Sequence, residues 1–185
     1  MAIREYGINP VRILIVDDDD LVLESLRYGI DNLMEDSVVE TTSSPHWALE
    51  RIGAEDYHVV LSDIEMPDLN GIELIRQVIG HQPAPACVLM TADSTWLPVA
   101  IDAGAYACLP KPVELDLLRT VLRHAIDFNL LQRRVERSRQ VLALQTRTTN
   151  EYCEQFQERT VGIERRMAEM RRKELDDVTA VWAWH

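Results

Sequence analysis

The sequence of 185 residues has few cysteines, few aromatic residues and no long apolar run. Its three cysteines, Cys87, Cys108 and Cys153, are odd in number and far apart. This spacing excludes a disulfide framework and a cysteine metal motif, and it favours a reducing compartment. Charged residues interrupt every apolar stretch before the roughly 20 residues that a membrane span needs. The first ten residues lack the profile of a signal peptide, so we expect a cytoplasmic protein.

Basic residues are scarce in the first two thirds of the chain. Residues 1–125 contain 21 acidic and 8 basic residues, whereas residues 126–185 contain 10 and 11. Because phosphate contacts need clustered lysine and arginine, we expect no nucleic-acid binding by the acidic part. The arginine pairs of the second part alternate with acids, which is typical first of a solvated helix face and only second of a nucleic-acid surface. The charge shift accompanies a division into two domains, 1–125 and 126–185.

Short apolar runs alternate with helix-like stretches in residues 1–125. The sequence predicts strands at 12–16, 38–42, 58–61, 86–90 and 106–109, with helices at 21–34, 45–53, 71–80 and 95–103. Strands separated by helix-length stretches need right-handed crossovers and so form a parallel sheet. We therefore predict an α/β, flavodoxin-like (βα)5 domain with a doubly wound parallel sheet and an extended C-terminal helix.

Proline and glycine almost disappear after this domain. Pro112 is the last proline and Gly162 the only glycine after Gly104, so one helix can run from Val113 past the domain edge. Every seventh residue from Val121 onward is apolar with one exception, whereas the residues three positions after each of these are mostly polar. The series is Val121, Phe128, Val135, Leu142, Thr149, Phe156, Ile163 and Met170. This half of a heptad seam predicts a coiled coil and a homodimer, with the poor helix formers at 145–150 alternatively forming a bend.

Polar side chains collect at the carboxyl ends of the predicted strands, where an open parallel sheet binds its ligands. They are Asp17, Asp18, Asp63, Thr91 and Lys111, the last being the only lysine of residues 1–125. Carboxylates this close repel one another unless a cation compensates, and Mg²⁺ (or Mn²⁺) suits oxygen ligands. A metal, a hydroxyl and an ammonium around one more carboxylate suit phosphoryl transfer onto that carboxylate. The alternative interpretation of Asp63, taken by itself, is a turn residue before a proline loop.

Four motifs resemble the receiver domain of two-component response regulators. ILIVDDDD, LSDIEMPDLNG, VLMTAD and GAYACLPKP follow the family's order and spacing over residues 11 to about 125. The resemblance implies that Asp63 accepts a phosphoryl group from a sensor histidine kinase or a histidine phosphotransfer protein. It also implies that Asp18 binds the metal directly, that Asp17 acts through water, and that the backbone carbonyl of Glu65 completes the protein ligands. The aspartates at 19 and 20 are expected to cap the first helix instead, where negative charge suits the dipole.

The resemblance also assigns the groups that hold the phosphoryl oxygens. Thr91 would hydrogen-bond to them, Lys111 would pair with them, and a cis peptide would join Lys111 to Pro112. The sequence departs from the family where an aromatic residue normally stands three positions before the lysine, because Cys108 occupies that place.

Other residues near the site are therefore candidates for the switch. Trp96 or Tyr106 could signal in place of the missing aromatic residue. Glu65 and Asp93 stand where the family tunes its dephosphorylation rate, and their alternative role is that of exposed loop charges.

No separate catalytic motif is present, so we expect no enzyme beyond the receiver's own Mg²⁺-dependent phosphotransfer and dephosphorylation. The first hypothesis is a response regulator whose helical extension, residues 126–185, forms a dimer and signals to an unidentified downstream partner. We call this extension the tail. The alternative is the regulatory N-terminal half of a larger enzyme effector, a cyclic-dinucleotide enzyme or a phosphatase, with the tail as linker. A transcription factor ranks last, because the tail offers no compact helix-turn-helix unit.

Overall fold

The computed structural model describes residues 10–34 and 36–182, with side chains as far as residue 170. The chain divides between Arg134 and Val135 into two compact units. The predicted assignment of 1–125 to a receiver domain and of 126–185 to an extension remains a prediction.

The first unit is built on one parallel sheet with the strand order β2-β1-β3-β4-β5. The strands are β1 (Val11–Val16), β2 (Ser37–Thr42), β3 (Val59–Asp63), β4 (Ala86–Thr91) and β5 (Ala107–Pro110). The order reverses beside β1, as expected for a doubly wound sheet. The predicted flavodoxin-like (βα)5 fold is confirmed.

In the described part of the chain, four helices connect the strands, a fifth follows β5, and the first three begin at side-chain caps. They are α1 (Asp20–Leu33), α2 (Pro45–Ala54), α3 (Gly71–Val78), α4 (Trp96–Asp102) and α5 (Leu115–Trp182). The side chains of Asp19, Ser44 and Asn70 accept hydrogen bonds from the first-turn amides of α1, α2 and α3. Such caps satisfy amide groups that have no partner within the helix. Asp19 therefore has the capping role that the sequence predicts.

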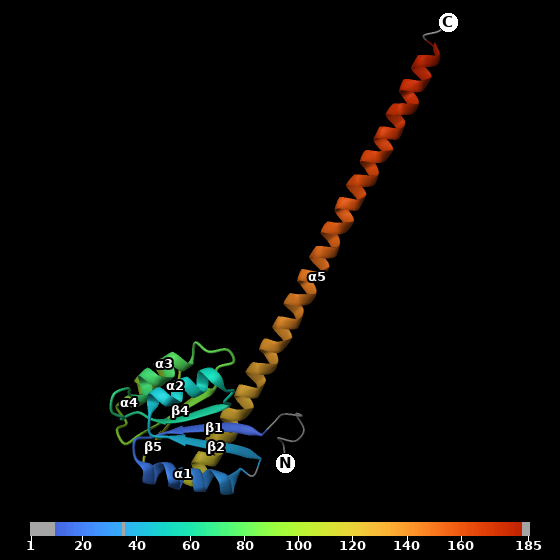
Figure 1. The fold of residues 1–185 in the computed structure, drawn as a ribbon. Coiled ribbons are helices and arrows are strands. Elements are labelled where there is room, and N and C mark those ends of the chain that lie inside the picture. The colour runs from blue at the N-terminus through green and yellow to red at the C-terminus, as the bar shows by residue number, and fades with distance from the viewer. Residues whose placement is uncertain (1–9, 35, 183–185) are drawn as a thin grey trace. The chain divides into compact units, whose positions relative to one another are not determined.

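The helices cover both faces of the sheet, as Figure 1 shows. Alternate residues of a strand point to opposite faces. Ile13 and Ile15 accordingly pack with α1 and the first turns of α5, whereas Leu14 and Val16 pack with α2, α3 and α4. This burial on both sides explains why the strands read as continuous apolar runs rather than as an alternating pattern.

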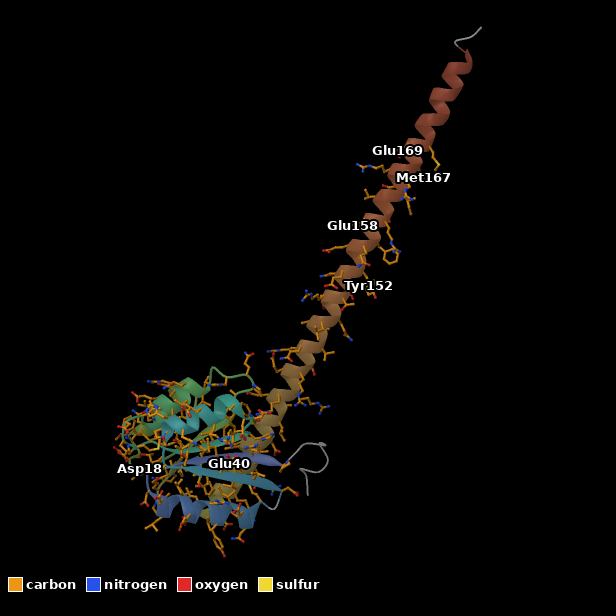
Figure 2. All side chains as sticks on the ribbon, viewed as in Figure 1. Asp18, Glu40, Tyr152, Glu158, Met167 and Glu169 are labelled. Carbon is orange, nitrogen blue, oxygen red and sulfur yellow. The ribbon has the colours of Figure 1, made fainter. Side chains whose placement is uncertain are left out.

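The tail of α5 is helical through the segment for which a bend was the alternative. The hydroxyls of Thr146, Thr148 and Thr149 donate to carbonyls four residues earlier, at 3.0, 3.0 and 2.9 Å. These bonds satisfy the threonine hydroxyls within the helix, which continues through residues 145–150. Figure 2 shows Tyr152 and Met167 projecting from the helix surface. Among the residues that the structure describes, no helix is long and apolar enough to cross a membrane.

Candidate functional site

Three aspartates meet at the carboxyl end of the sheet. Asp17 directly follows β1 and Asp63 ends β3, and the two strands are neighbours. The side chains of Asp17 and Asp63 are almost fully buried, whereas Asp18 is exposed at the sheet edge (Figure 2). One carboxylate oxygen from each of the three lies within 4.8 Å of the others. Parallel strands thus bring together residues that are 46 positions apart in the sequence.

A single ammonium group balances part of this charge. Lys111 Nζ donates to Asp17 Oδ2 at 2.9 Å and lies 3.0 Å from Asp63 Oδ1. Burial of Lys111 opposes its charged form, but the hydrogen bond to Asp17 and the ion pair with Asp63 outweigh burial and raise its pKa. The other oxygen of Asp17 accepts from the amide of Asp19 at 3.0 Å. Both oxygens of Asp17 therefore have partners.

Asp63 is different, because its Oδ1 is buried and has no hydrogen-bond donor within the described residues. Lys111 approaches this atom as an ion pair, but without the geometry of a hydrogen bond. A buried acceptor without a donor is costly to leave unsatisfied. Three carboxylates face one ammonium, so the cluster has an excess of negative charge. The residues present therefore fit a divalent cation, and Asp17, Asp18 and Asp63 are the groups that would hold it.

Thr91 lies at the end of β4 and is bound to the loop that follows it. Its hydroxyl accepts from the amide of Asp93 at 3.0 Å and donates to the carbonyl of Asp93 at 3.2 Å. The carboxylate of Asp93 accepts from the amide of Thr95, and this backbone bond lowers its pKa. The amide of Lys111 donates to the carbonyl of Thr91 at 2.8 Å, which brings the ends of β4 and β5 together. The peptide bond between Lys111 and Pro112 is cis.

The loop after Asp63 folds back tightly on its own strand end. The amide of Gly71 donates to the carbonyl of Ile64 at 3.0 Å. A Cβ atom at Gly71 would lie 2.0 Å from the carbonyl oxygen of Asp63. Only glycine fits there, so Gly71 supports the position of Asp63. Gly71 ends the LSDIEMPDLNG motif, but no role for it was predicted from the sequence. Glu65, in the same loop, is exposed.

The candidate switch residues lie on both faces of the sheet. Cys108 is half-buried and packs on the α2–α4 side, where burial raises the pKa of its thiol. Trp96 is partly buried on that same side. Tyr106 packs on the other face, and its ring centroid lies 5.1 Å from that of Phe128 on α5. The structure therefore does not bring the three together.

Comparison of the sequence with known proteins gives matches to its first two thirds. Residues 13–123 match the family described as the response regulator receiver domain. Response regulator MprA of Mycolicibacterium vanbaalenii is 40% identical over 116 residues, which cover 62% of this chain and 49% of that protein. A protein-glutamate methylesterase/protein-glutamine glutaminase of Rhodopseudomonas palustris is 36% identical over 105 residues, or 55% and 29% of the two chains. This chain spans half or less of the length of these two relatives.

Solved structures resemble the first unit. A receiver domain protein from Methanospirillum hungatei has a TM-score of 0.60 and 27% identity, covering 66% of this chain and 98% of that one. One from Clostridium thermocellum has a TM-score of 0.61 and 25% identity, with the same coverage. The receiver domain of an HD domain-containing protein from Pseudomonas fluorescens has a TM-score of 0.64, covering 69% and 94% of the two chains. Its identity is 23%, so it supports the fold alone.

Proposed function

Because this chain belongs to the response regulator receiver domain family, we propose that it accepts a phosphoryl group on Asp63 and passes the signal to its helical tail. The donor is a phosphohistidine of a sensor histidine kinase or of a histidine phosphotransfer protein. A carboxylate oxygen of Asp63 attacks the phosphorus atom, and the phosphorus–nitrogen bond breaks as the new oxygen–phosphorus bond forms. The released imidazole takes up a proton, and Asp63 becomes an aspartyl phosphate.

The buried and unsatisfied Oδ1 of Asp63 is the observation that carries this proposal. It lies beside a lysine that can offset the charge of an incoming phosphoryl group. When bound by Asp17, Asp18, Asp63 and the carbonyl of Glu65, Mg²⁺ or Mn²⁺ would neutralise the phosphoryl oxygens. Lys111 pairs with the phosphoryl group once it is attached.

The hydroxyl of Thr91 is the second protein group that we assign to the phosphoryl oxygens. To reach them it exchanges its bonds with the backbone of Asp93 for a bond to phosphate. Charged groups donate and accept the stronger hydrogen bonds, which favours the exchange. Glu65 and Asp93 are both exposed, and we assign to them the tuning of the dephosphorylation rate.

Tyr106 offers a route from the site to α5 that does not use Cys108. Lys111 follows directly after β5, and Tyr106 directly precedes the same strand. The ring of Tyr106 contacts Phe128, which belongs to the heptad series of α5. A displacement of β5 would therefore reach α5 through this ring pair. Trp96, on α4, is the alternative reporter on the opposite face.

The tail carries apolar side chains that a second copy of the chain would cover. In the second unit, Leu142, Phe156 and Ile163 are 64%, 68% and 58% exposed. They recur at heptad spacing, which suits a helix of the same sequence as partner. We therefore propose a homodimer through the tail, which presents the signal to a downstream partner.

Light scattering of the full chain tests this function. We expect a dimer mass in the presence of Mg²⁺ and beryllofluoride, a mimic of the phosphoryl group. The Leu142→Glu variant should reduce this mass to that of a monomer, because it places a charge in the seam. Leu144→Glu is the matched control, since both leucines are 64% exposed but only Leu142 belongs to the heptad series.

The molar mass of the wild-type chain, measured with and without beryllofluoride, determines the role of the tail. A mass that rises with beryllofluoride supports assembly as the output. A dimer in both states supports a standing coiled coil through which the signal travels. A monomer in both states contradicts the proposed dimer.

A further inference from the structure

Two polar side chains of α5 are buried in the first unit, outside all four motifs. Asn129 is 1% and Arg133 is 7% exposed. Arginine is seldom buried unless its charge and its donors are paired. We refer to Asn129 and Arg133 together as the α5 clamp.

The α5 clamp holds two loops at the amino ends of the strands. Arg133 Nη1 donates to both carboxylate oxygens of Asp56 at 2.7 Å, and its Nη2 donates to the carbonyl of Tyr57 at 2.6 Å. Arg133 Nε donates to Asn129 Oδ1 at 2.5 Å. Asn129 Nδ2 donates in turn to the carbonyl of Ala84 at 2.7 Å. Residues distant in the sequence are thus fixed to one turn of helix.

These loops lead into the two central strands of the site. Tyr57 lies two residues before β3, and Ala84 lies two residues before β4. Asp63 ends β3 and Thr91 ends β4. Strands of this length span roughly 17–20 Å, so the α5 clamp and the phosphoryl site lie at opposite ends of the same pair of strands.

His58 completes the polar groups around the clamp. Its carbonyl accepts from the amide of Ala86 at 2.9 Å, which joins the starts of β3 and β4. Burial and the neighbouring charge of Arg133 together lower the pKa of His58 to about 4, although the charge of Asp56 opposes this shift. His58 is therefore neutral near pH 7, and Asp56 supplies the charge that pairs with Arg133.

From these contacts we infer that Arg133 is a positioning residue for the phosphoryl site. Arg133 holds the start of β3 directly, and Asn129, to which it donates, holds the start of β4, so a shift between the two strands strains or moves the α5 clamp. The inference rests on the proposed phosphoryl function of Asp63. Energetic coupling is reciprocal, so an α5 clamp that is strained when the phosphoryl site is occupied changes the affinity of that site when it is weakened. Arg133 lies ten residues beyond the segment that matches the family, in the extended part of α5.

The test is the affinity of the full chain for beryllofluoride in the presence of Mg²⁺, measured by calorimetry. The Arg133→Met variant keeps an unbranched apolar side chain but removes the guanidinium of Arg133 with all its hydrogen-bond donors. We expect its dissociation constant to change at least threefold. Arg137→Met is the matched control, because Arg137 lies one turn further along and is exposed. Its dissociation constant should equal that of the wild type.

If the Arg133→Met variant does not fold, a milder variant, Asp56→Asn, can still test the inference. Asp56→Asn weakens only the ion pair, and the side chain of Asp56 is 61% exposed. We expect it to shift the affinity in the same direction by a smaller factor. A lower melting temperature with unchanged affinity in the folded variants would mean a purely structural role and would overturn the inference. Failure of the wild type itself to bind beryllofluoride would overturn the proposed function as well, which distinguishes the two failures.

Discussion

The Asp63→Asn variant is expected to lose phosphoryl uptake. With acetyl phosphate as donor and Mg²⁺ present, labelling of the full chain should fall by at least about 100-fold, as expected when a nucleophile is removed. The amide of asparagine has nearly the shape of the carboxylate but lacks its nucleophilic charge. Lys111 also keeps its bond to Asp17, so the variant should retain the fold. Intact-mass spectrometry measures the uptake and circular dichroism the fold.

Two controls accompany this substitution. Asp31→Asn makes the same chemical change at an exposed carboxylate on α1, and it should label like the wild type. Removal of Mg²⁺ by a chelator should suppress labelling of the wild type, since the three aspartates otherwise repel the incoming phosphoryl group. If the Asp63→Asn variant folds and is still labelled, on another residue, the result contradicts the assignment of Asp63.

Among the proposed substitutions, Gly71→Ala is expected to cause the largest loss in the free energy of unfolding. The new Cβ would lie 2.0 Å from the carbonyl oxygen of Asp63 and 2.9 Å from its carbonyl carbon. Both are backbone atoms, so the strand end or the helix start must move. We expect a loss of roughly 3 kcal/mol in the free energy of unfolding, in the range of strongly disruptive core changes. Phosphoryl uptake should fall as well, because Asp63 moves with its backbone.

Urea unfolding measures this effect, and a second glycine provides the control. At Gly80 the nearest atom to an added Cβ is 3.7 Å away, an ordinary contact. Gly80→Ala should therefore change the free energy of unfolding by no more than about 1 kcal/mol. An unchanged urea midpoint for Gly71→Ala would contradict the close approach of this loop to Asp63.

The fold and the members of the aspartate cluster could be predicted because they follow from local patterns. Apolar runs located the strands, and the common direction of parallel strands put Asp17, Asp63 and Lys111 at one edge. The cap at Asp19 followed from its place before a helix. The orientation of the Thr91 hydroxyl toward the backbone of Asp93 could not follow, since it depends on the course of a loop.

The α5 clamp could not be predicted for a different reason. The alternation of the tail's arginine pairs with acids, with Arg133 and Arg134 as the first pair, predicts a solvated helix face. Burial of the α5 clamp depends on the rotational position of α5 and on distant acceptors: Asp56 and Tyr57 accept from Arg133 across 77 and 76 residues, and Ala84 accepts from Asn129 across 45. No pattern within a helix encodes such partners. The steric role of Gly71 could not be predicted either, although the residue ends the LSDIEMPDLNG motif, because its constraint comes from the backbone of Asp63 rather than from its neighbours.

The central claim is that Asp63 carries the phosphoryl group, and chemical mapping tests it most directly. The full chain is phosphorylated with acetyl phosphate and Mg²⁺, and borohydride then reduces the aspartyl phosphate to homoserine. Peptide mass spectrometry locates the reduced residue. We predict homoserine at position 63 and intact aspartate at positions 17 and 18. Reduction at another residue, with Asp63 unchanged, would contradict the proposed phosphoryl site.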